Sequence, residues 1–475
     1  MREFDVGIIG AGPAGIFAAI ELEKRTGGKA RIIVFDKGLR VEHRRCPLAV
    51  RQENNLTPSP PIKTYNCGDC QICHIMYGVG GAGALSSGIV NLRPDVGGDL
   101  DKLLGDWNKA EELIKYIDEI FVEFGAPKDS LIMPDPKKSK NIEKLAAKAG
   151  AKYIPTPQRV LGTDVMVQIV SNMTKYLEER NVKISTLTSV EDIRRDQGGF
   201  KLITNRGEFY VKKLLIAPGR GGAKWFKEIA MKIGIEIEPG PLDIGVRVEI
   251  PYYVAEHITS INHDPKIVMY TKVYDDMVRT FCTNPQGYVL KEYYDDGTIG
   301  VNGETYRVFK SKNTNFALLV TLRLTDPYSD VLELAKSIAR IATRVGIGKP
   351  IIQRLGDLEK GRRSTWERIS RSVITPTLKD VTPGDISIVL PHRVIQNLLE
   401  AIERLDEIYP GVASPQTLLY APEIKYYGVK AKADYKLETN IEGIFVAGDG
   451  VGLSRGINVA AATGILAARA IASVL

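Results

Sequence analysis

Cysteine and histidine are scarce in this chain of 475 residues, which has only five of each. Four of the cysteines lie between Cys46 and Cys73, which predicts a local site and argues against a disulfide framework spread over the chain. No Ser/His/Asp constellation and no pair of catalytic carboxylates stands out. If the chain is an enzyme, we therefore expect a bound cofactor to carry its chemistry.

The chain also lacks a strong charge of either sign. Its 64 basic and 57 acidic residues give a net charge of +7, spread over the whole length, whereas a dedicated nucleic-acid-binding protein normally carries a dense basic stripe. A signal peptide is not indicated, because Glu3 and Asp5 precede the first apolar run. The apolar segment Gly456–Leu475 contains Asn458 and Arg469, which are costly in a bilayer, so we expect a buried helix there. These features predict a cytoplasmic protein with no membrane span and no stable nucleic-acid partner, and they leave the oligomeric state open.

The remaining sequence has no internal repeat and no low-complexity segment. With 44% apolar and 25% charged residues, the chain is neither disordered nor collagen-like. At roughly 150 residues per domain, its length permits two or three domains, each large enough for a core of its own.

One glycine-rich segment has the full context of a dinucleotide-binding turn. A β-branched apolar strand, Phe4–Ile9, leads into Gly10-Ala-Gly12-Pro-Ala-Gly15, a helical pattern follows, and Asp36 ends the next strand. The first glycine allows the tight turn, the second lets a pyrophosphate approach the backbone, and the third lets helix pack on strand. The acidic residue would accept hydrogen bonds from a ribose, and the helix would offer its first N–H groups to the phosphates. The residues expected at the dinucleotide are Gly10, Gly12, Pro13, Ala14, Gly15, Asp36 and Lys37.

A second G-x-G-x-x-G match, Gly78–Gly83, has no predicted strand before it. Two later segments favour FAD over NAD as the dinucleotide. Leu214–Gly219 (LLIAPG) is a strand that enters a tight turn after a β-meander, and Gly443–Gly450 (GIFVAGDG) precedes a helix that begins near Arg455. With the first motif, they resemble the fingerprints of two-dinucleotide-fold flavoproteins, except that Pro218 replaces the usual threonine. The resemblance implies that Asp449 holds the ribityl chain or a water that bridges to the phosphates, and that the last helix directs its positive end at the flavin pyrimidine. The residues that it places near FAD are Gly80, Gly81, Ala82, Pro218, Gly219, Gly448, Asp449, Gly456, Ile457 and Asn458.

Six segments together resemble a family of largely uncharacterised FAD-dependent dehydrogenases of archaea and bacteria. They are Tyr77–Ser87 (YGVGGAGALSS), Gly240–Glu249 (GPLDIGVRVE), Arg279–Val289 (RTFCTNPQGYV), Asn315–Thr321 (NFALLVT), Thr417–Tyr427 (TLLYAPEIKYY) and Gly448–Gly456 (GDGVGLSRG). This resemblance specifies the family and is silent on the substrate. Many relatives carry a second cysteine beside the equivalent of Cys282; here Asn284 stands there, so we expect no dithiol at that point. No second Rossmann unit remains for a separate nicotinamide-binding domain.

The most unusual motif consists of four cysteines, namely Cys46, Cys67, Cys70 and Cys73. A C-x2-C-x2-C run can hold one face of an iron–sulfur cluster, with the distant Cys-Pro closing the fourth corner. Zinc, with help from His43 or His74, is one alternative, and a redox dithiol that exchanges electrons with the flavin is another. A structural disulfide or idle thiols, as in a hyperthermophile, complete the alternatives. We take the iron–sulfur cluster as the first hypothesis. Such a cluster could carry single electrons away from the flavin, and it could equally hold a long loop in place.

Few side chains stand out as contacts for the substrate itself. The candidates near the last fingerprint are Arg455, Tyr420, Glu423 and Lys425. The alternative for the last three is an exposed strand of alternating polarity, and Arg455, like Arg220, could merely pair with a nearby carboxylate. Lys360–Arg368 (KGRRSTWER) is a basic segment with a tryptophan, which most simply indicates a solvated face and alternatively a contact with RNA.

These observations predict an α/β fold in which a discontinuous, Rossmann-like FAD-binding domain, with a parallel sheet and a β-meander, carries an inserted α+β substrate domain. The expected parts are the FAD-binding segments 1–98, 151–244 and 415–475, a helical insert at 99–150, and the substrate domain at 245–414. The predicted function is that of an FAD-dependent dehydrogenase that oxidises a small-molecule substrate, or a nicotinamide, by hydride transfer to flavin. The alternatives are a flavin-dependent RNA-modifying protein and a non-catalytic flavin subunit of an electron-transfer complex. Neither the substrate nor the electron acceptor is specified.

Overall fold

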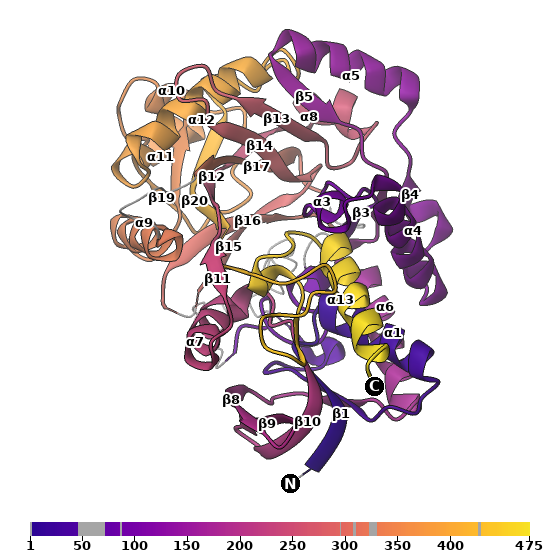
Figure 1. Ribbon diagram of the computed structural model, residues 1–475. Coiled ribbons are helices and arrows are strands. Elements are labelled where there is room, and N and C mark those ends of the chain that lie inside the picture. The colour runs from indigo at the N-terminus through magenta and orange to yellow at the C-terminus, as the bar shows by residue number, and fades with distance from the viewer. Residues whose placement is uncertain are drawn as a thin grey trace, which may run out of the picture. The chain divides into compact units, whose positions relative to one another are not determined.

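The computed structural model describes residues 2–45, 72–85, 88–294, 296–306, 310–322, 330–425 and 429–475. Their contacts divide the chain into two compact units (Figure 1). Unit 1 comprises Met1–Lys128, Thr163–Pro239 and Tyr427–Leu475, and unit 2 comprises Asp129–Gly162 and Gly240–Tyr426. The segment 99–150, expected as a separate insert, contributes to both units. The finer domain boundaries stay predictions.

Unit 1 is built on five parallel strands. Their order is β7 (Lys183–Ser185), β2 (Ile32–Phe35), β1 (Arg2–Ile9), β10 (Gly207–Ile216) and β22 (Ile444–Val446). The first half of β10 also pairs with the antiparallel meander strand β9 (Gly199–Thr204), which in turn pairs with β8 (Val190–Asp196). The parallel sheet and the β-meander predicted from the sequence are therefore both confirmed.

Helices α1 (Pro13–Thr26) and α13 (Ile457–Ala472) pack closely within unit 1 (Figure 1). A Cβ at Gly464 would lie 2.0 Å from the Ala14 carbonyl oxygen, so glycine is needed for this approach. Most of α13 is buried, which confirms the buried helix expected at the carboxyl end. No helix among the described residues is long and apolar enough to cross a membrane. The other helices of this unit are α3 (Leu100–Leu104), α4 (Trp107–Glu123), α6 (Gly162–Glu179) and α7 (Ala223–Ile233).

Unit 2 is built on an eight-stranded, mostly antiparallel sheet. Its order is β19 (Thr382–Pro383), β18 (Ile351–Arg354), β20 (Leu418–Lys425), β12 (Leu242–Pro251), β17 (Asn313–Leu322), β14 (Met277–Asn284), β13 (Lys266–Tyr270) and β5 (Ala151–Ile154). Its helices are α5 (Pro136–Lys148), α8 (Tyr252–Thr259), α9 (Val331–Val345), α10 (Leu355–Leu358), α11 (Trp366–Ser370) and α12 (His392–Leu405). The α+β character predicted for this region is confirmed.

The two faces of this sheet differ sharply in polarity. Successive side chains of a strand point to opposite faces, and in β12 the apolar set Ile244, Val246, Val248 and Ile250 belongs to the hydrophobic core. The opposite face carries Asp243, Arg247 and Glu249, and each of these is fully buried. We call it the polar face. The hairpin of β15 (Tyr288–Tyr293) and β16 (Ile299–Glu304) packs against it, since a Cβ at Gly303 would lie 2.4 Å from the Arg247 guanidinium.

Short strands complete the two units. They are β3 (Ile89–Asn91), β4 (Leu131–Ile132), β6 (Gln158–Val160), β11 (Ile237–Pro239) and β21 (Val429–Ala431).

Candidate dinucleotide-binding site

The first glycine motif forms the turn between β1 and α1. Each of its three glycines has a different structural role. Gly10 has a φ of +101°, and a Cβ there would lie 2.1 Å from the Ala217 carbonyl oxygen. A Cβ at Gly15 would lie 1.9 Å from the Gly10 carbonyl oxygen. At Gly12 a Cβ would meet only the Gly81 Cα, at 3.8 Å. Gly10 and Gly15 are therefore required by the fold, whereas Gly12 keeps open the space beside the start of α1.

Asp36 lies at the end of β2, beside this turn. Its carboxylate accepts hydrogen bonds from the Ala11 N–H at 3.0 Å and the Gly38 N–H at 2.8 Å. The Gly10 N–H donates to the Phe35 carbonyl at 2.8 Å. The acidic residue is thus attached to the turn itself, which is the arrangement that recognition of a ribose next to a pyrophosphate requires.

The second glycine-rich segment, Gly78–Gly83, lies against the first. No described strand leads into it, but the Gly80 N–H donates to the Ala11 carbonyl at 2.8 Å. A Cβ at Gly81 would lie 3.0 Å from the Gly12 Cα, and one at Gly83 would lie 2.9 Å from Ile457 at the start of α13. The segment therefore lines the space between the starts of α1 and α13, beside the residues predicted to contact the dinucleotide.

A buried arginine that the sequence reasoning missed holds this segment in place. The Arg44 guanidinium donates to the carbonyls of His74 (2.9 Å), Ile75 (2.9 Å) and Val79 (2.7 Å). Burial lowers the pKa of Arg44 to about 10, an effect that the nearby Asp36 carboxylate opposes. Because its partners are carbonyls 30 to 35 residues away, no motif or spacing in the sequence signals this role.

Tyr77 is a second residue that the sequence reasoning did not single out. Its hydroxyl donates to the Gly221 carbonyl at 3.0 Å, and the Lys37 ammonium lies 3.3 Å from the centre of its ring. Lys37, predicted at the dinucleotide, therefore has a cation–π partner at this point of unit 1.

The middle and last fingerprints meet at the carboxyl ends of β10 and β22. A Cβ at Gly450 would lie 2.2 Å from the Gly219 carbonyl oxygen, which brings the turn after Pro218 against the one after Gly448. The Asp449 carboxylate accepts a hydrogen bond from the Ser454 hydroxyl and lies 3.7 Å from the Arg220 Nε. Burial raises the pKa of Asp449 even though Arg220 opposes this rise. For Arg220, pairing with a carboxylate is thus the alternative that the structure shows.

The last helix begins at a glycine, which has no side chain to cap it. Gly456 is the N-cap of α13 and makes no side-chain capping bond, as is also true of Gly12 at α1. The Asn458 amide donates to the Val96 and Arg93 carbonyls, at 2.8 and 3.1 Å, and the Arg455 N–H donates to the Gly97 carbonyl at 2.7 Å. The Asn458 Oδ1 is buried without a hydrogen-bond partner among the described residues. Helix α7 of this unit also begins at an uncapped glycine, Gly222. The starts of α1 and α13 differ from it in following the dinucleotide fingerprints, and together with the orphaned acceptor they fit an anionic dinucleotide with a hydrogen-bonding ring system.

The three substrate candidates of β20 are not exposed. The whole strand is buried, so an exposed strand of alternating polarity is wrong. Glu423 accepts from Arg247 at 2.6 and 2.7 Å and lies 2.9 Å from the Lys425 ammonium. The Tyr420 hydroxyl donates to Glu249, and burial raises the pKa of both groups. These side chains lie in unit 2, whereas Arg455 lies in unit 1.

The metal prediction falls mostly on residues that the structure does not describe. Cys46, Cys67 and Cys70 lie outside the described residues, and Cys73 is half-buried with a free thiol. Within the described part of the chain, no group of three or more His, Cys, Asp or Glu side chains could hold a metal. The cysteine site therefore stays a prediction.

Two of the four basic residues in the segment 360–368 pair with the same carboxylate. Arg362 lies 2.8 Å from the buried Asp357 carboxylate, and Arg368 lies 3.9 Å from it. This pairing reduces the charge that the segment could offer to RNA.

Comparison with known proteins supports the FAD interpretation. A family model described as "FAD-dependent protein, C-terminal domain-like" matches residues 241–426. The match confirms the resemblance to FAD-dependent proteins predicted from the sequence. An uncharacterized protein of Clostridium beijerinckii is 24% identical over 481 aligned residues, which cover 96% of this chain and 79% of the relative.

Three solved structures align with nearly the whole chain. Glycine oxidase from Geobacillus kaustophilus has a TM-score of 0.36 at 16% identity, covering 99% of this chain and 95% of its own. L-proline dehydrogenase from P. horikoshii has a TM-score of 0.39 at 13% identity, with coverages of 98% and 91%. A flavoprotein/dehydrogenase from Cytophaga hutchinsonii has a TM-score of 0.42 at 10% identity, with coverages of 100% and 79%.

Proposed function

We propose that this chain is an FAD-dependent oxidoreductase that oxidises a small organic substrate. The observation that carries the proposal is the meeting, in unit 1, of the three fingerprint segments, with two helices that start at uncapped glycines. The family match of residues 241–426 supports FAD as the dinucleotide. Bound FAD would supply a ring that accepts a hydride and passes electrons on.

Each part of the site has a distinct task in this proposal. The N–H groups at the start of α1 bind the pyrophosphate, with Gly12 leaving room for it, and Asp36 accepts hydrogen bonds from the ribose. Asp449 holds the ribityl chain. The first N–H groups of α13 would hold the flavin carbonyl, where they would favour the negative charge of the reduced ring. In this proposal the protein positions and tunes the cofactor, which carries the chemistry.

We further propose that the four cysteines hold an iron–sulfur cluster that removes single electrons from this site. Support comes from the described end of the motif. The Cys73 carbonyl accepts a hydrogen bond from the Tyr77 N–H at 3.1 Å, and the adjacent His74 carbonyl accepts one from Arg44. Cys73 thus bonds to Tyr77, which directly precedes the segment Gly78–Gly83 that packs on the first glycine motif.

Visible spectroscopy of purified protein tests the cofactor. We expect a flavin spectrum and, for an iron–sulfur cluster, a broad shoulder that dithionite bleaches and metal analysis attributes to iron. A colourless protein that cannot be reconstituted with FAD would refute the proposal.

Anaerobic reduction tests the activity. A panel of amino acids, hydroxy acids, amines and NAD(P)H should contain a compound that bleaches the flavin. If none does while dithionite does, the chain is a passive flavin subunit. Retention on heparin that modest salt abolishes would instead support an RNA substrate.

A further inference from the structure

We propose that helix α5 of unit 2 binds the phosphate backbone of a nucleic-acid duplex, without regard to its base sequence. This inference concerns a surface of unit 2 alone and goes beyond the proposed function, on which it does not depend.

Much of the net charge of the chain lies in one short stretch. Residues 128–152 contain seven lysines and three acidic residues. About a twentieth of the chain therefore carries +4 of the total charge of +7. The expectation of no stable nucleic-acid partner depends on an even spread of charge, and this stretch departs from it. Lysines clustered along one helix are the electrostatic sign of a nucleic-acid partner.

The lysines of α5 form a row on its exposed side. Lys137, Lys140, Lys144 and Lys148 follow one another at intervals of three and four residues, which places them on one face of the helix. All four residues are exposed. At 1.5 Å per residue the row extends over about 16 Å. A duplex carries one negative charge per about 1.7 Å of its axis, so the row is long enough to contact several phosphates.

Few carboxylates neutralise this row. Glu143 is the only acidic residue within α5, and Asp135 before it serves as the N-cap by accepting a hydrogen bond from the Lys138 N–H at 2.8 Å. Lys148 lies 2.6 Å from the Glu407 carboxylate. The four other lysines of the helix have no ion-pair partner among the described residues, and they are Lys137, Lys138, Lys140 and Lys144.

This arrangement of charges works against the stability of the helix. Lys140 and Lys144 are four residues apart, a spacing at which like charges repel each other on a helix. Lys137 and Lys138 lie in the first turn, where the helix dipole disfavours cations and where α5 has no acidic residue. Packing on the sheet does not require these charges, whereas a bound polyanion would turn each of them into a favourable contact.

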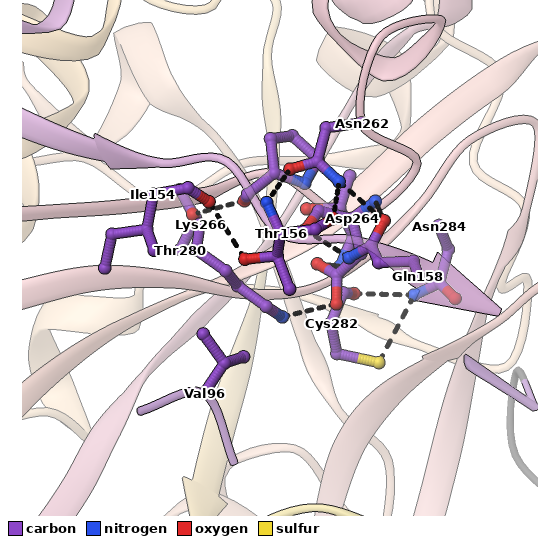
Figure 2. Close-up of polar contacts among 12 residues, drawn as sticks. Val96, Ile154, Thr156, Gln158, Asn262, Asp264, Lys266, Thr280, Cys282 and Asn284 are labelled. Carbon is purple, nitrogen blue, oxygen red and sulfur yellow. Dashed lines mark hydrogen bonds and ion pairs between the residues drawn. The ribbon is translucent and has the colours of Figure 1, made fainter. Parts of the chain in front are cut away.

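The row belongs to a firmly held part of unit 2. On the opposite side of α5, Ile142 and Ala146 are part of the hydrophobic core, and the helix packs beside the edge strand β5 (Figure 1). Buried amides fix the chain that follows β5. Figure 2 shows Asn262, whose amide donates to the Thr156 carbonyl at 2.9 Å and to the Gln158 side chain at 2.7 Å. A helix held in this way loses little freedom when a partner binds, which favours affinity.

The same helix is poorly suited to a membrane or to a protein partner. A helix that lies in a membrane surface buries its apolar side in the lipid, and the apolar side of α5 is already buried in the core of unit 2. The centres of protein interfaces are rich in aromatic and arginine side chains and poor in lysine, and α5 contains no aromatic residue and no arginine. Lysine ammonium groups are compact point charges, and contacts from them to phosphates carry no sequence information.

Fluorescence anisotropy tests this inference with the full chain and labelled duplexes of about 20 base pairs, made as DNA and as RNA. For the double variant Lys140→Gln, Lys144→Gln we expect at least tenfold weaker binding at about 50 mM salt. Its plot of log affinity against log salt concentration should be less steep by about 2, because each phosphate contact contributes about 0.9 to the slope.

The matched control is the double variant Lys109→Gln, Lys115→Gln on α4. It removes the same two charges from exposed lysines that lie 3.7 and 3.5 Å from a carboxylate of their own helix, and it should bind as the wild type does. Retention on heparin alone does not locate a basic surface, so these variants decide.

Several outcomes would overturn the inference. These are the absence of duplex binding at about 50 mM salt, equal binding by the wild type and the α5 variant, and equal losses in the α5 variant and the control. Tighter binding to phosphatidylglycerol vesicles, or to a single strand, than to the duplex would also overturn it. In contrast, a chain that binds the duplex through α5 but never takes up FAD would refute the oxidoreductase and leave this inference standing.

Discussion

Replacing Gly12 with alanine should empty the dinucleotide site without harming the fold. The φ of Gly12 is −76°, which alanine adopts readily, and the new Cβ would meet only the Gly81 Cα at 3.8 Å. Alanine is a poorer N-cap than glycine by roughly 1 kcal/mol, but it restricts the unfolded chain and regains about 0.4–1 kcal/mol. The two effects nearly cancel. We therefore expect the free energy of unfolding of the FAD-free protein to change by less than about 1 kcal/mol.

FAD affinity should respond very differently. The methyl group would enter the space through which the pyrophosphate approaches the backbone, so we expect at least a tenfold loss, about 1.4 kcal/mol. Gly15→Ala provides the contrast, because its Cβ would lie 1.9 Å from the Gly10 carbonyl and should destabilise the FAD-free protein by about 1–3 kcal/mol. Equilibrium dialysis with FAD and denaturant unfolding of the FAD-free proteins measure the two quantities. A Gly12→Ala protein that retains FAD as the wild type does would refute the assignment of this turn to the pyrophosphate.

Four other changes test separate parts of the structure. Asp449→Asn should stabilise the FAD-free protein at pH 7, because burial raises the pKa of this carboxyl and disfavours its charged form. The gain in thermal stability should vanish as the pH falls below the unfolded pKa of 3.8. A gain that stays constant with pH would contradict this reasoning. Burial lowers the pKa of His263 to about 4, so the folded protein should lose up to about 3 kcal/mol of unfolding free energy as the pH falls from 6.5 to 4. Denaturant unfolding of His263→Gln should show a smaller loss over the same pH range. A loss equal to that of the wild type would contradict this role of His263. Arg44→Lys should cost about 2–3 kcal/mol in unfolding free energy because lysine cannot reach the same set of carbonyls, whereas the exposed Arg45→Lys should cost almost nothing. Cys67→Ser should abolish the dithionite-sensitive shoulder and spare the flavin peak, and Cys282→Ser should affect neither.

The parts of the site that could be predicted depend on short stretches of chain. The strand, turn and helix around Gly10 follow one another within 26 residues, and each glycine serves its own local geometry. The meander before Pro218 and the buried helix after Gly456 are likewise visible in local patterns. Local patterns left other details open. Within the helical insert expected at 99–150, the first helix ends at Gly105, which has a φ of +62°, and Asp106 caps a new helix by accepting from the Asn108 N–H at 2.9 Å.

The contacts that could not be predicted join distant residues. Arg247 and Glu423 are 176 residues apart, and Glu249 and Tyr420 are 171 apart. Each pair forms only because β12 and β20 lie side by side in the sheet. From the sequence alone, Glu423 and Lys425 read as alternating polar residues of an exposed strand, because a charged side chain is seldom buried unless a partner is present. The sequence does not show that Arg247 is the partner of Glu423.

The contrast between the two faces of this sheet bears on what the polar face does. The apolar face already supplies a hydrophobic core, with β12 contributing four β-branched side chains. Ion pairs as deeply buried as Arg247–Glu423 add little to stability on average, and apolar residues of similar size often serve a fold equally well. Stability therefore does not explain why the same strand carries Asp243, Arg247 and Glu249 on its other side. These charges do fix how two strands meet, because Arg247 of β12 donates to Glu423 of β20 at 2.6 and 2.7 Å across the pairing of the two strands.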